Sequence, residues 1–188
     1  MKNFYLFILC VFCACSSPDA DLPEGDRLGN QVIFSFGEKV KTKGLKLVGF
    51  GGAEDKENLG MTRQLSASFK INSELTVPIA RKLIVEVTDE FLRMINADEK
   101  LRQYLSPYPF TAKNVDVAIF GINPNNRDDR LLYVSLYDTF VAYRKDNPKG
   151  GRLIAVFDED YDEAVRRLQI EEDIVSYSAS DKTDLLAR

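Results

Sequence analysis

The sequence predicts an α+β protein, with an antiparallel sheet of about six strands, one long helix packed on one face and a short C-terminal helix. Two observations support this fold class. Several short segments carry apolar residues with the alternation of strands, and one central segment carries them with the spacing of a helix. The links between the later strands are short and rich in Asn, Pro and Gly, which favours hairpins over long crossovers.

The first half of the chain contains three predicted strands. Residues 31–36 (QVIFSF) and 44–50 (GLKLVGF) are apolar runs of strand length. Residues 61–72 alternate strictly, which indicates a strand with one buried face. The apolar members of that alternation are Leu65, Ala67, Phe69 and Ile71.

A long helix is predicted over residues 76–97. Its apolar residues recur every three or four positions and therefore share one face. We expect Leu83, Val87, Phe91 and Met94 to face the sheet. A shorter helix is predicted at 98–105, where prolines then stop it.

The second half of the chain returns to strands. They are predicted at residues 114–121, 131–143 and 152–157, and the DNPKGG sequence of residues 146–151 predicts a hairpin turn. The final helix is expected to begin near Asp160.

Composition excludes several classes of function. The chain has 188 residues, of which 45% are hydrophobic and 29% charged, with a net charge of −4. That acidic balance argues against broad nucleic-acid binding. There is no histidine, so Ser-His-Asp and Cys-His catalysis and histidine metal sites are impossible. We therefore predict no metal, no cofactor and no catalytic residues; an enzyme would have to rely on Asp, Glu, Lys, Tyr or Ser.

The N-terminus has the features of an export signal. Lys2 precedes an apolar run over residues 4–14, which is too short to span a bilayer. The following Ala14-Cys15-Ser16 resembles the processing site of bacterial lipoproteins, although Phe12 stands where that class usually has leucine. The alternatives are an ordinary signal peptide cut near Ala14 and an uncleaved anchor.

The resemblance to bacterial lipoproteins implies where the protein is located. Cys15 would become the lipidated N-terminus, carrying a diacyl chain and an N-acyl group such as palmitate, and would anchor the protein in the membrane of the cell envelope. In Gram-negative lipoproteins a serine in the position of Ser16 usually accompanies sorting to the outer membrane. The anchor would leave the domain in the periplasm or at the cell surface.

Four segments of the chain follow from these observations. Residues 1–14 are the predicted signal peptide, and residues 15–30 are the lipid anchor with a flexible tether rich in Pro, Gly and polar residues. Residues 31–175 form a single predicted domain, and residues 176–188 a flexible tail.

Lys39, Lys41 and Lys43 alternate in the sequence KVKTKGLK. In an extended chain all three would point to one side. They are a candidate surface contact with anionic lipid, a glycan or a protein partner. The other interpretation is an edge strand that uses lysine to prevent aggregation.

Four further motifs each have a structural interpretation beside the functional one. Acidic residues 158–163 resemble the start of a calcium loop but also suit the start of a helix. Glu86 and Glu90 are either a paired-carboxylate site or a solvated helix face. Residues 49–52 (GFGG) are either a phosphate loop or a bulged strand, and residues 104–110 (YLSPYPF) either a recognition platform or a rigid turn.

The predicted function is that of a lipid-anchored protein of the cell envelope with a binding or structural role, whose partners are the membrane and an envelope protein or glycan. The first alternative is a solute- or glycan-binding module, which a deep aromatic-lined pocket would favour. The second is a carboxylate-dependent hydrolase. Two buried acids with raised pKa values, about 5–9 Å apart in a cleft, would favour it.

Overall fold

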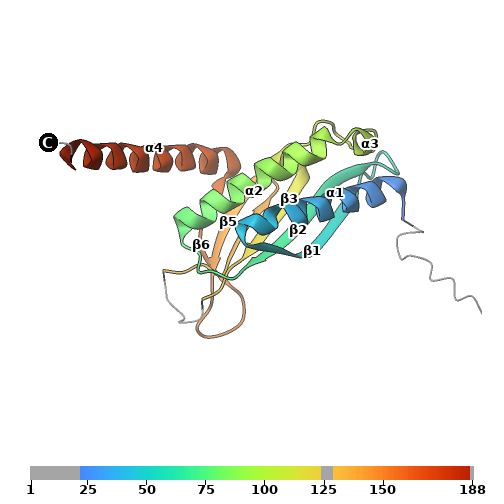
Figure 1. Cartoon of the computed structure of the whole chain (residues 1–188). Helices are drawn as coiled ribbons and strands as arrows, with labels where there is room; N and C mark the ends of the chain where they lie inside the picture. Colours follow the sequence, from blue (N-terminus) through green and yellow to red (C-terminus); the bar gives the residue numbers. More distant parts are fainter. Residues whose placement is uncertain (1–21, 124–128, 187–188) are drawn as a thin grey trace, which may run out of the picture.

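A computed structural model describes residues 22–123 and 129–186, with side chains as far as Ile174. The predicted signal peptide, Cys15 and the beginning of the predicted tether lie outside these residues. The described part is an α+β structure in which two helices lie over one face of a mixed sheet, and a third helix extends away from it (Figure 1).

The sheet has six strands in the order of the sequence. All neighbouring strands are antiparallel except β2 and β3, which are parallel. The α+β class is confirmed, but the purely antiparallel sheet is wrong, because the chain crosses between β2 and β3 through a helix and so returns to the same end of the sheet. The strands are β1 (Leu45–Glu54), β2 (Thr62–Ile71), β3 (Val115–Phe120), β4 (Tyr133–Tyr137), β5 (Phe140–Lys145) and β6 (Ile154–Asp160).

The first helix corrects two predictions. Residues 31–36, predicted as a strand, and residues 24–30, assigned to the tether, both belong to α1 (Glu24–Val40). The helix buries Leu28, Val32, Ile33, Phe36 and Val40, at helical spacing. Three glycines share this face, and they let the helix approach the sheet closely. A Cβ atom on Gly29 would lie 3.0 Å from Leu65 Cδ2, and one on Gly37 would lie 3.1 Å from Leu47 Cδ2.

The long central helix is confirmed as α2 (Val77–Ala97). Val87 and Phe91 are fully buried as predicted, while Leu83 and Met94 are only partly buried. Phe91 stacks on Phe36 with ring centroids 4.8 Å apart, so two helices share the core where one was expected. Truncating such a buried Phe to Ala costs about 3–5 kcal/mol. Other buried apolar residues of α2 are Ala80, Ile84, Val85 and Ile95.

The predicted strand over residues 131–143 is in fact a hairpin. Asp138 and Thr139 have positive φ angles of 45° and 72° and form the two-residue turn between β4 and β5. Such a turn requires left-handed backbone at both positions, and it is usually marked by glycine. Here the sequence YDTF contains none, so the turn was missed.

The remaining helices are α3 (Glu99–Arg102) and α4 (Tyr161–Leu186), with 3-10 turns at Lys41–Lys43 and Ala112–Asn114. The short helix within 98–105 and a helix beginning next to Asp160 were both predicted. The predicted tail beyond residue 175 differs, because α4 continues to Leu186 and leaves the body of the domain on the side where β6 lies (Figure 1).

Candidate functional site

A cleft of about 460 Å³ lies at one end of the sheet, where β2 and β3 begin and β4 ends. This volume lies within the range of about 300–1,000 Å³ that is typical of small-molecule sites. Three segments distant in sequence meet there because β2 and β3 are parallel and β4 is antiparallel to them. The lining residues are Arg63, Gln64, Pro107, Pro109, Thr111, Lys113, Asn114, Tyr137 and Asp138.

Two side-chain amides, one buried and one partly buried, hold the wall of this cleft in place. Asn114 accepts from the Thr111 backbone N–H at 3.1 Å, and its own amide donates to the Arg63 carbonyl at 3.2 Å. On the other side of the wall, the side chain of Asn96 from α2 donates to the Phe110 carbonyl and accepts from the Phe110 N–H, both at 2.8 Å. The cleft is therefore attached to the rigid part of the domain.

The proline-rich segment of residues 104–110 forms one rim of the cleft. The segment is a helix-to-strand turn, as its structural interpretation predicted, with Phe110 buried and Tyr104 packed against the core. Tyr108 stays 45% exposed, with the guanidinium of Arg102 5.2 Å from its ring centre. The sequence pattern identified the segment, but only the fold shows that Pro107 and Pro109 face the cleft.

The chemistry of the cleft suits binding. Arg63 and Lys113 are exposed cations that line the cleft together with Tyr137, which is 65% exposed, and the exposed acid Asp138. Cations attract a carboxylate or phosphate, and an exposed aromatic ring can stack on a sugar or another flat group. One aromatic ring and an open mouth do not make the deep aromatic-lined pocket that would have favoured the solute-binding alternative most strongly.

A carboxyl group lies behind the cleft. Asp116 on β3 accepts from Gln64 Nε2 at 2.8 Å and from Ser66 Oγ at 3.4 Å. Burial raises the pKa of Asp116, and the charge of Asp138 raises it further, although the two hydrogen bonds oppose the change. The hydrolase alternative needs two such acids, and Asp138 instead lies exposed at the hairpin turn. Asp116 alone does not support catalysis.

The three lysines do not form an edge strand. Lys39 lies in the last turn of α1, and Lys41 and Lys43 lie in the 3-10 turn that follows. Lys39 and Lys43 form ion pairs with Glu90 and Glu86 of α2. The edge-strand interpretation is therefore wrong, and two of the three cations join helices to each other.

The remaining sequence candidates are mostly engaged in ion pairs or strands. Glu86 and Glu90 form the solvated helix face that was the structural alternative. Residues 49–52 lie within β1, beside an irregularity in its pairing with β2, as the bulged-strand interpretation predicted. In the acidic segment, Asp158 pairs with Arg144.

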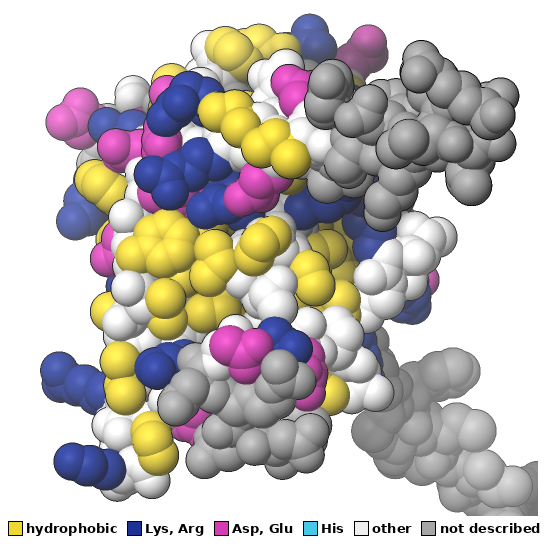
Figure 2. Space-filling view, turned by 90° about the vertical axis from the view of Figure 1, so that its left-hand side faces the viewer, with side chains coloured by type: hydrophobic (Ala, Val, Ile, Leu, Met, Phe, Trp, Pro, Cys, Tyr) yellow, Lys and Arg dark blue, Asp and Glu magenta, His cyan; other side chains and the backbone are white. Residues whose placement is uncertain are grey.

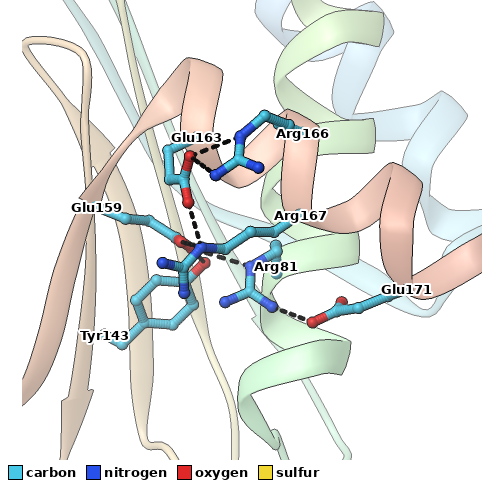
Figure 3. A network of polar contacts seen from close by, with 7 residues as sticks. All are labelled: Arg81, Tyr143, Glu159, Glu163, Arg166, Arg167 and Glu171. Atoms are coloured by element: carbon cyan, nitrogen blue, oxygen red, sulfur yellow. Dashed lines mark hydrogen bonds and ion pairs between the residues drawn. The ribbon is translucent and has the colours of Figure 1, made fainter.

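Glu159 belongs to a buried cluster that the sequence did not indicate (Figure 3). Arg81 of α2 donates through Nε to Glu159 Oε1 at 3.0 Å, and the Tyr143 hydroxyl donates to the same oxygen at 2.5 Å. All three side chains are almost completely buried. Arg81 also pairs with Glu171, and Arg167 Nε lies 3.5 Å from Glu159 Oε2.

The pKa values in the cluster follow from burial and charge. Burial would lower the pKa of Arg81, but the hydrogen bond and charge of Glu159 outweigh it and raise that pKa. Burial raises the pKa of Tyr143, and the adjacent carboxylate raises it further. Arg81 and Tyr143 therefore keep their protons at physiological pH, and the cluster connects α2, β5, β6 and α4.

Comparisons with known proteins do not identify a family: no family model, curated protein or solved structure matches this chain. Two properties of the described part bear on its chemistry. None of its helices combines the length and apolar character needed to cross a membrane. Within the same residues, no three or more His, Cys, Asp or Glu side chains come together as a metal site would require.

Proposed function

We propose that this chain is a bacterial lipoprotein of the cell envelope, and that its domain binds an anionic solute or glycan in the cleft at the end of the sheet. The location in the cell envelope is supported by Lys2, the apolar run of residues 4–14 and Ala14-Cys15-Ser16. Lipid at Cys15 would hold the domain beside the membrane, where envelope glycans are at hand.

The observation that carries the binding role is the set of side chains at the mouth of the cleft. Arg63 and Lys113 supply positive charge on a protein of net charge −4, and Tyr137 supplies a ring face. An acidic sugar presents both a carboxylate and a flat apolar face, so it matches this arrangement. The buried Asn114 holds the backbone of Arg63 in position through a hydrogen bond to its carbonyl, while the guanidinium stays exposed to reach a ligand.

A titration with two sugars tests the binding role. An oligogalacturonate should bind more tightly than an uncharged maltooligosaccharide of equal length. Changing Arg63 and Lys113 together to Gln should weaken oligogalacturonate binding by roughly tenfold, because exposed ion pairs contribute up to about 1 kcal/mol each and about 1.4 kcal/mol corresponds to a tenfold change in affinity. The matched control changes Lys46 and Lys149, which are exposed and outside the cleft, to Gln.

Two results would contradict the proposed ligand class. Equal binding of the charged and uncharged sugars would remove the role of the cations. Equal weakening by the control pair would show a general charge effect instead of a site.

A fractionation experiment tests the proposed lipid anchor. Cys15→Ala should remove the protein from the detergent-extracted membrane fraction, or leave an unprocessed precursor, because no thiol remains at the processing site. The wild-type mass should correspond to an acylated chain beginning at Cys15. Cys13→Ala is the matched control and should leave both results unchanged. A soluble mature chain with another N-terminus would contradict the anchor.

A further inference from the structure

β6 is an edge strand whose first half is apolar and whose last three residues are acidic. It is the last strand of the sheet, and the apolar residues Leu153, Ile154 and Val156 in and beside it are 38%, 38% and 43% exposed. Residues 153–157 contain no charged residue and no proline, two of the usual means of blocking an edge, although the strand pairs irregularly with β5 at Val156. An exposed apolar edge of this kind is typical of a strand that pairs with another chain.

The opposite edge of the sheet is protected differently. β1 contains Lys46 and three glycines, and its exposed Phe50 is in contact with Phe34 of α1, with ring centroids 4.6 Å apart. β1 nevertheless has an exposed valine at an irregularity of its pairing, Val48, which is 53% exposed. Val156 lies at the corresponding irregularity of β6. The two edges therefore allow a matched comparison.

Apolar side chains gather on the face around β6. Figure 2 shows a hydrophobic patch there, bounded on one side by a band of basic and acidic side chains. The last helix leaves the domain on this side, and its Ile170 and Ile174 are 46% and 63% exposed. A single copy of the described domain leaves both apolar surfaces in solvent.

The charges of β6 are complementary to themselves when the strand is reversed. Exposed Arg152 stands just before the strand, and Asp158, Glu159 and Asp160 end it. In an antiparallel pair of two β6 strands centred on Val156, Arg152 of each copy lies opposite Asp160 of the other. A two-fold axis produces this arrangement automatically, because such an interface presents the same surface from both copies.

We propose that β6 is the interface between two copies of this chain, which pair antiparallel through their β6 strands and extend the sheet across a two-fold axis. The apolar centre of the strand is covered in the pair, and the basic start of each strand meets the acidic end of the other. This association is independent of the cleft, which lies at the strand ends.

Cysteine cross-linking in cells that express the full chain tests this interface. The described residues contain no cysteine, so a single introduced thiol reports on its own position. Val156→Cys lies at the two-fold axis and should give a disulfide-linked dimer several-fold more abundant than Val48→Cys does, since opposite residues of an antiparallel pair bring their Cβ atoms close. The parent chain, treated identically, measures any contribution of the N-terminal cysteines.

Charge reversal distinguishes pairing from chance contact. In the Val156→Cys chain, Arg152→Glu should lower the dimer yield severalfold by placing acid against acid. Adding Asp160→Arg to that variant should restore the yield, which a misfolded chain would not do. Equal dimer yields from Val156→Cys and Val48→Cys would overturn the proposal. It would also be overturned if Val156→Cys became linked to a different protein, or if charge reversal left the dimer yield unchanged.

Discussion

One ion pair in the core joins helix α2 to strand β6, and another at the surface joins helix α1 to α2. In the core, Arg81 and Glu159 have side chains that are 5% and 4% exposed. At the surface, Lys39 and Glu90 have side chains that are 50% and 23% exposed. The same kind of ion pair therefore occurs once in the protein interior and once in contact with water. This difference in burial decides how much each pair contributes to stability.

The buried pair is costly to break and the surface pair is not. Removing one partner from a buried pair leaves a charge in the core without water or a counter-ion. Removing one partner from an exposed pair leaves a charge that water and salt solvate, and such pairs contribute about 0–1 kcal/mol. Three experiments test this contrast.

The largest effect is expected from Arg81→Ala. It leaves the Glu159 carboxylate buried, with the Tyr143 hydroxyl as a hydrogen-bond donor and the half-exposed Arg167 as the one remaining cation of the cluster near it. The free energy of unfolding should fall by about 3–5 kcal/mol in urea titrations. The control is Arg93→Ala on the same helix, whose arginine pairs with Glu90 at the surface and is 60% exposed. Its loss should stay below about 1 kcal/mol. Similar losses for the two variants would mean that burial does not set the difference.

A smaller effect is expected from Tyr143→Phe, which removes only the hydroxyl that donates to Glu159. Hydrogen bonds to charged groups contribute about 1.5–3 kcal/mol, so the unfolding free energy should fall by that amount. Tyr137→Phe removes a hydroxyl from a side chain that is 65% exposed and should change little. An unchanged stability for Tyr143→Phe would show that the carboxylate finds another partner.

The smallest effect concerns pH and the surface pair. The hydrogen bond from Arg93, followed by the one from Lys39, lowers the pKa of Glu90 from 4.5 to about 2. A lowered pKa in the folded state contributes stability above pH 4.5, and this contribution is lost as the pH falls towards 2. Solvent screening keeps the contribution small.

Acid unfolding curves of Lys39→Gln measure the surface contribution. The variant should lose slightly less stability than the wild type between pH 4.5 and 2, because part of the pKa shift of Glu90 is gone. Lys41→Gln is the control, since Lys41 pairs with Glu38 three residues earlier and not with Glu90. A steeper acid loss in Lys39→Gln than in the wild type would contradict the assignment.

Periodicity was sufficient to predict the elements whose residues alternate between core and solvent. β2 and α2 were predicted closely because burying one face of an element imposes its own period on the sequence. In β2, Leu65, Ala67 and Phe69 are buried and the residues between them are not. No knowledge of the neighbouring elements was needed for these assignments.

The same reasoning failed for α1 because its face includes glycines. Gly25, Gly29 and Gly37 lower the intrinsic preference for helix, and a short apolar run beside them has the appearance of a strand. Their helical spacing, at positions shared with Leu28 and Val32, was a signal that could have been found. What makes glycine suitable there is the proximity of β1 and β2, which is a property of the fold.

The cleft and the buried cluster depended on the tertiary structure. Arg81 and Glu159 are 78 residues apart, and in sequence each is one of many charged residues. Arg63, Lys113 and Tyr137 meet only because a crossover and a hairpin bring three chain segments to one end of the sheet. The sequence by itself determined the buried face of β2 and most of the buried face of α2, since local pattern suffices for such elements. The lipid anchor at Cys15 stays a prediction from the sequence. Which charges are buried, and which meet in the cleft, was decided by packing, because desolvation acts on groups according to their neighbours in space.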